Sequence, residues 1–88
     1  MSSYSVVIEP AARRQLKQFK RSHPQLLRHF ISLIDGLGRL PYQGKPLTGN
    51  KKGCYSLRYE DYRIIYIIYE LEKCVQVVRV GHRREVYR

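Results

Sequence analysis

CYSLRYEDYRIIYIIY, residues 54–69, is the stretch that decides the fold. On both sides of Glu60 and Asp61, aromatic and β-branched residues dominate two short runs, a pattern typical of two strands joined by a two-residue turn. This turn pairs Tyr59 with Tyr62 and Arg58 with Arg63, and it fixes every pair behind them. We therefore predict an antiparallel hairpin of residues 54–59 and 62–69.

The two faces of this hairpin differ in chemistry, because successive side chains of a strand point to opposite faces. One face is apolar and aromatic, and we expect helices to cover it; it holds Tyr55, Leu57, Tyr59, Tyr62, Ile64 and Tyr66. The other face holds Ser56, Arg58, Arg63 and Ile65, and we expect it to stay open.

Upstream of the hairpin, the periodicity predicts a strand and two helices. A β-rich run at residues 4–8 leads into Pro10, a residue that suits the first turn of a helix. Two apolar helix faces follow, separated by the break at residues 22–24. They consist of Ala12, Leu16 and Phe19, and of Leu26, Phe30, Leu33 or Ile34, and Leu37.

The rest of the chain completes an α+β fold. Residues 41–53 have the glycine, proline and lysine content of an exposed loop, and residues 74–82 form a further strand. The predicted order is βααβββ, with two N-terminal helices packed on one face of a mainly antiparallel sheet.

The length of 88 residues suits one domain, residues 1–88, since so short a chain supports a single core. No apolar run approaches the roughly 20 residues that span a bilayer, and the first residues do not resemble a signal peptide. We expect a cytoplasmic protein without a membrane partner.

The chain is strongly basic. Lysine and arginine outnumber aspartate and glutamate by 17 to 7, which gives a formal charge of +10 and attracts polyanions. Nucleic acid, an acidic protein or an anionic membrane could each be the partner. Candidates for contacts with such a polyanion lie on the first helix, in the loop and near the end: Arg13, Arg14, Lys17, Lys20, Lys51, Lys52 and Arg84.

The predicted pairing of Arg58 with Arg63 places two like charges side by side, which is unfavourable in a sheet. A phosphate would offset this repulsion, because each guanidinium forks two hydrogen bonds onto phosphate oxygens. Screening by Glu60, Asp61 or solvent explains the pair equally well. The hairpin thus predicts a phosphate site or a solvated charged edge.

Further reactive side chains close the chain. His82, Arg83 and Tyr87 could stabilise charge on a phosphate or move protons, although a solvated basic tail has the same composition. Asp35 and Asp61 are the only aspartates and lie on separate elements, so we expect neither a two-metal site nor a cofactor.

Several of these strings resemble a known family. LTG at residues 47–49, YRIIY at 62–66 and VGHRREVY at 80–87 are similar in order and spacing to the RelE toxins of the RelE/ParE superfamily. The match covers nearly the whole chain. The resemblance implies a RelE-like toxin of a type II toxin–antitoxin system: an mRNA interferase that cuts messenger RNA in the ribosomal A site through the RNA 2′-hydroxyl, without metal, and inhibits translation.

The resemblance also assigns roles. Arg58 and Arg63 resemble the arginines that bind phosphate and stabilise the transition state, Arg83 a third that assists the leaving oxygen, and Tyr87 a residue that stacks or transfers a proton. Where some RelE proteins have a lysine, this chain has Ser56, so His82 or Tyr87 would take over as base. The implied partner is an acidic antitoxin.

Two other functions remain open. A ParE-like toxin would share the fold and poison DNA gyrase without cutting RNA. A non-catalytic basic module would bind nucleic acid through its helices, and Arg63 and Arg83 would then matter little.

Overall fold

The predicted hairpin is present in the computed structural model, which describes residues 3–86 and side chains as far as Arg84. Its strands are β3, Cys54–Tyr59, and β4, Tyr62–Tyr69. Tyr59 pairs with Tyr62 and Arg58 with Arg63, so the predicted register is confirmed.

The hairpin is part of a five-stranded sheet with the order β1-β5-β4-β3-β2. Strand β5, Cys74–His82, runs antiparallel to β4, and β1, Ser5–Ile8, runs parallel to β5. A bulge between Ile65 and Tyr66 shifts the register of β4 and β5. The predicted α+β class is confirmed, and the sheet is antiparallel except at β1.

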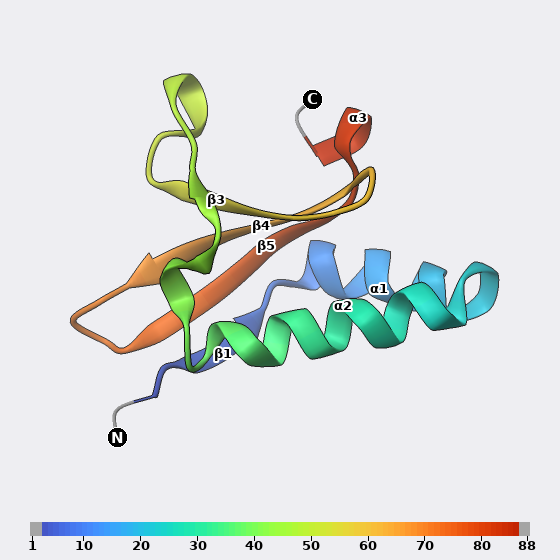
Figure 1. Cartoon of the computed structure of the whole chain (residues 1–88), viewed down its shortest axis with the longest axis horizontal. Helices are drawn as coiled ribbons and strands as arrows, with labels where there is room; N and C mark the ends of the chain where they lie inside the picture. Colours follow the sequence, from blue (N-terminus) through green and yellow to red (C-terminus); the bar gives the residue numbers. More distant parts are fainter. Residues whose placement is uncertain (1–2, 87–88) are drawn as a thin grey trace.

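Two helices cover one face of this sheet (Figure 1). We call the face that these helices do not cover the open face. They are α1, Pro10–Ser22, and α2, Pro24–Leu37, and each begins at a proline whose missing N–H costs nothing in a first turn. The core between the layers combines the predicted helix faces with the inner strand residues. Its fully or almost fully buried members include Ala12, Leu16, Phe30, Ile34, Leu37, Ile64, Tyr66, Val75, Val77 and Val80.

The segment predicted as a plain loop contains regular structure, which corrects the order βααβββ. It holds two short 3-10 turns, η1 at Pro41–Gln43 and η2 at Gly49–Lys51. Between them β2, Lys45–Pro46, pairs antiparallel with β3. Two residues, one of them proline, carry no strand periodicity, so the sequence pattern missed this edge strand.

The described chain ends in α3, Arg83–Val86, directly after β5. The Arg83 N–H donates to the Asp61 carbonyl oxygen at 2.9 Å, which ties α3 to the hairpin turn. Among the described residues, no helix is long and apolar enough to cross a membrane.

Candidate functional site: a cationic surface on the open face

Arg58 and Arg63 form the centre of the site, and we call them the arginine pair. They are direct partners across β3 and β4 and therefore share a face. Nε of Arg58 and Nη1 of Arg63 both donate to the carbonyl oxygen of Glu60, at 3.1 Å and 3.4 Å, and Nη1 of Arg63 also reaches the carbonyl oxygen of Tyr62 at 3.1 Å. Both guanidinium groups thus converge on the end of the hairpin.

Backbone carbonyls hold the pair. Among residues whose side chains the structure describes, no aspartate or glutamate forms an ion pair with either arginine. A guanidinium has five N–H donors, and one or two carbonyl contacts leave several of them for an anion. Arg58 is exposed and Arg63 is half-buried, so both are accessible.

The pair lies on the face that the helices leave open. Side chains alternate along β4, and Ile64 and Tyr66 belong to the core below. Ile65 is buried but lies outside that core cluster, as expected for the opposite face. The predicted assignment of the two hairpin faces is therefore confirmed.

Arg83 lies at the same end of the sheet as the arginine pair. Its backbone N–H contacts the turn that joins the two paired strands, and its side chain is exposed. Arg84 is also exposed on α3. Tyr87, the last predicted site residue, lies outside the described residues.

His82 is not brought to this group. It pairs with Tyr62, and the two rings lie 5.7 Å apart in an edge-on contact. Tyr62 itself packs edge-on against Phe19 of α1 and Phe30 of α2, so His82 lies on the helix side of the sheet. Its Nδ1 accepts the Arg84 backbone N–H at 3.3 Å, a contact at the start of α3.

The other predicted cations lie on different elements from the pair. Four of the five basic residues of α1 were predicted as contacts, and all four are exposed on the helical layer: Arg13, Arg14, Lys17 and Lys20. Lys51 is half-buried in η2, and Lys52 is exposed directly after it. The molecule therefore has at least two cationic regions, one on the open face and one on α1.

Two cations on the open face were missed from the sequence. Lys45 of β2 lies opposite Ser56, and Arg79 of β5 lies opposite Ile65. Both partners share the face of the arginine pair, since each is two positions from Arg58 or Arg63 along its strand. Only the strand pairing reveals these neighbours, because Lys45 and Arg79 are far from the hairpin in sequence.

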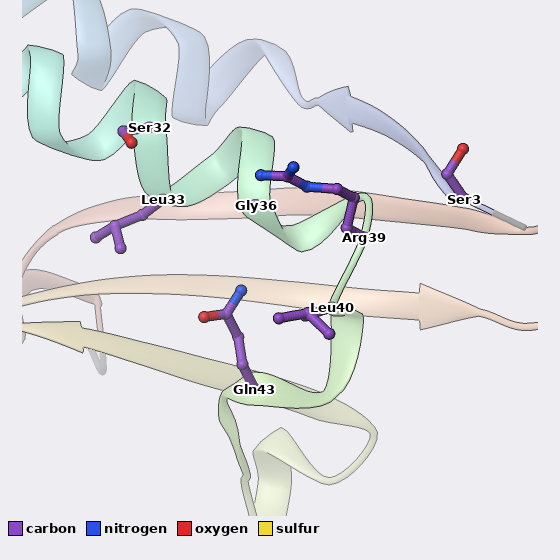
Figure 2. Close-up of a pocket in the computed structure, with 7 residues that line it drawn as sticks. All are labelled: Ser3, Ser32, Leu33, Gly36, Arg39, Leu40 and Gln43. Atoms are coloured by element: carbon purple, nitrogen blue, oxygen red, sulfur yellow. The ribbon is translucent and has the colours of Figure 1, made fainter. Parts of the chain in front are cut away.

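A hollow of about 340 Å³, which we call the β2–β3 hollow, adjoins the pair. Three of its lining residues are cations and none is acidic; they are Gln43, Gly44, Lys45, Leu47, Ser56, Leu57, Arg58 and Arg63. A larger hollow of about 970 Å³ lies where α2 ends, and Arg39 is its only charged lining residue. Figure 2 shows Gln43 reaching from the following segment toward α2 there, with Leu40 beside it. Neither arginine of the pair lines this hollow.

The described residues contain no group of three or more histidine, cysteine, aspartate or glutamate side chains placed to hold a metal ion. The guanidinium and ammonium groups of the open face are of the kind that binds phosphate oxygens through charge-assisted hydrogen bonds.

The chain is similar to known toxins. Residues 6–87 match the family model described as the ParE toxin of the type II toxin–antitoxin system parDE. The toxin RelG of Mycobacterium tuberculosis is 34% identical over 97% of both chains. A chain of the toxin–antitoxin complex RelBE2 from the same organism has a TM-score of 0.82 and 32% identity, covering 92% of this chain and 99% of its own. A double arginine-to-alanine mutant of the Escherichia coli toxin RelE, in the free state, shares the fold at a TM-score of 0.75 and 19% identity, over 97% of this chain and 90% of its own.

The family match and the shared fold identify the chain as a toxin of the type II toxin–antitoxin class. Within that class, the chain belongs to the RelE/ParE family.

Proposed function

We propose that this toxin is a ribosome-dependent endoribonuclease that cuts messenger RNA in the ribosomal A site. The observation that supports this best is the arginine pair on the open face, held by backbone carbonyls and without a carboxylate partner among the described side chains. Ion pairs within the protein would have neutralised these two guanidinium groups. Two adjacent guanidinium groups that remain accessible suit a phosphodiester, on which negative charge builds up during cleavage.

The proposed reaction uses the RNA as its own nucleophile. The 2′-oxygen attacks the neighbouring phosphorus, and the bond from phosphorus to the 5′-oxygen breaks. A base takes the 2′-hydroxyl proton, and the leaving 5′-oxygen receives a proton. The products are a 2′,3′-cyclic phosphate and a 5′-hydroxyl, and no step uses water or a metal ion.

The arginines divide the work in this scheme. Arg58 and Arg63 hold the non-bridging oxygens of the scissile phosphate, and Arg83, at the same end of the sheet, assists the leaving oxygen. Tyr87 stacks on a base of the RNA. His82 has no role here, because its ring packs with Tyr62 on the helix side.

The proposed regulator is an acidic antitoxin. A chain of the RelBE2 toxin–antitoxin complex is similar to 92% of the present chain. The charge of +10 also favours an acidic partner that folds as it binds. The antitoxin segment that folds in this way would cover the open face and neutralise the charge of the arginine pair.

The ParE-like alternative is kept because the matching family model is described as the ParE toxin. A toxin with that function would poison DNA gyrase and would not cleave RNA. The arginine pair would then serve only to attract an acidic partner.

Mapping 5′ ends on messenger RNA in a translating extract separates these functions. Codon-phased cuts by the wild type are expected, with upstream fragments that end in a cyclic phosphate. Arg63→Ala and Arg83→Ala should lower the rate by at least about 100-fold, since each removes a charge-assisted contact of the transition state. Tyr87→Phe should retain most activity if stacking is its role.

Intact messages together with broken DNA would instead establish the gyrase function. If both messenger RNA and DNA stay intact, the protein would be a non-catalytic module that binds nucleic acid. Free RNA should be cut poorly, because the ribosome supplies substrate position, and rapid cleavage of naked RNA would contradict the ribosome-dependent part.

A further inference from the structure

The edge strand β2 brings a third cation to the arginine pair. Lys45 lies directly opposite Ser56, and Ser56 precedes Arg58 by two positions, so the three side chains share the open face. Lys45 is exposed, whereas Ser56 is 7% exposed. The exposed Lys45 side chain therefore lies beside the buried Ser56 on the open face.

The backbone around Lys45 is fixed on both sides. The Gly44 N–H donates to the Tyr66 hydroxyl at 3.0 Å, and this hydroxyl donates to the Pro41 carbonyl oxygen at 2.8 Å. After Lys45, the Leu47 N–H donates to the Cys54 carbonyl oxygen at 2.9 Å. A Cβ on Gly44 would come within 2.6 Å of the Tyr66 hydroxyl, so the approach requires glycine. A solvated loop lysine would not need such anchoring.

Between Lys45 and the arginine pair lies the β2–β3 hollow of about 340 Å³. Its lining residues include three cations and no acid, and Leu47 supplies apolar contact. Positive charge around an apolar wall suits a nucleotide unit, which combines a phosphate with a base. The hollow opens directly onto the arginine pair, so such a unit would adjoin the phosphate held there.

We propose that Lys45 is a substrate-binding residue that holds the phosphate next to the scissile one, with the intervening nucleotide in the β2–β3 hollow. This inference rests on the proposed function. An ammonium group suits a phosphate that does not react, because it attracts charge without imposing the planar geometry of a guanidinium.

The test compares Lys45→Gln and Lys45→Arg with the control Lys73→Gln. Lys73 lies at the opposite end of the sheet, in the turn between β4 and β5, with its Nζ 5.2 Å from the Tyr4 ring centroid. Two quantities are measured: single-turnover cleavage on programmed ribosomes, and the salt dependence of binding to a 2′-O-methyl RNA hexanucleotide, which lacks the nucleophile and cannot be cut. Thermal melts establish that each variant is folded.

We expect Lys45→Gln to lower cleavage about tenfold or more, the loss of one contact between charged groups. The slope of log affinity against log salt should fall by about 0.7, the value for one phosphate contact on a single strand. Lys45→Arg should keep most of both quantities, and Lys73→Gln should match the wild type.

Two results would overturn the inference: Lys45→Gln behaving like Lys73→Gln, or a loss of cleavage without a change of slope, which would indicate a structural role. A wild type that does not cut RNA would refute the proposed function instead. The slope measured on the uncleavable RNA would then still decide the role of Lys45.

Discussion

Glu60 shows how one residue supports the site. Its carbonyl oxygen accepts hydrogen bonds from both members of the arginine pair, and its φ of 54° lies in the left-handed region. A residue other than glycine costs about 1 kcal/mol or more in this conformation. The tight turn nevertheless keeps Arg58 and Arg63 side by side, so backbone strain accompanies the feature that the function needs.

Substitution at Glu60 tests this strain. Glu60→Gly should leave the free energy of unfolding unchanged or raise it by up to about 1 kcal/mol, because glycine adopts positive φ freely. Glu60→Val should lower it by at least about 1 kcal/mol, because a branched Cβ is poorly accommodated there. Denaturant unfolding measures both, and equal stability of the two variants would contradict a strained turn.

At the scale of elements, the hairpin was predictable and the edge strand β2 beside it was not. Two alternating strands around a two-residue turn fix their own register, so the pairing of Arg58 with Arg63 followed from residues 54–69 alone. Strand β2 has only two residues, and its pairing depends on the remote Tyr66 contact with Gly44. Lys45 therefore escaped the sequence analysis.

His82 is a different case, because the sequence analysis named it as a candidate site residue but did not predict which face of the sheet it occupies. Its neighbours in sequence suggested that it belonged with Arg83, whereas strand alternation turns it to the side of Val80 and Tyr62. The bulge at Ile65 and Tyr66 shifts the register of β5 against β4. The sequence pattern of the two strands does not predict this bulge.

The contact between Tyr66 and the β2 segment predicts a specific dependence on pH. Burial raises the pKa of Tyr66 above the usual value near 10, against the lowering effect of the Gly44 N–H. The folded state thus favours the neutral phenol. Its contribution to stability is complete below about pH 10 and is lost as the pH rises through the higher folded pKa.

Tyr66→Phe removes this contribution. The variant should lose about 1 to 3 kcal/mol of unfolding free energy at pH 7, because the Gly44 N–H and the Pro41 carbonyl lose their partner. Its stability should also fall less steeply than that of the wild type above pH 10. Tyr69→Phe, which alters an exposed tyrosine, serves as the control; an unchanged alkaline slope in Tyr66→Phe would contradict the assignment.

At the scale of the whole molecule, the charge of +10 is divided between two layers. The exposed cations of α1 lie on the helical layer, whereas the arginine pair and Lys45 lie on the open face. We expect the first group to attract the ribosome and the second to act on the scissile RNA. This division could not be read from composition, because it depends on which sheet face the helices cover.

Kinetics separate the two layers. A variant with glutamine at four of the five basic α1 positions, Arg13, Arg14, Lys17 and Lys20, should raise the half-saturating ribosome concentration and weaken its salt dependence. The cleavage rate at saturation should change little. Arg63→Ala should mainly lower that rate, and a common effect of both variants on one parameter would contradict the division.

The central claim, that Arg58 and Arg63 act together on one phosphate, is tested most directly by a double-mutant cycle of single-turnover cleavage on programmed ribosomes. The account predicts that Arg58→Ala and Arg63→Ala each cause a large loss, and that the double variant loses far less than the product of the two, since a broken pair no longer stabilises the charge. Losses that multiply independently, or no loss at all, would contradict it.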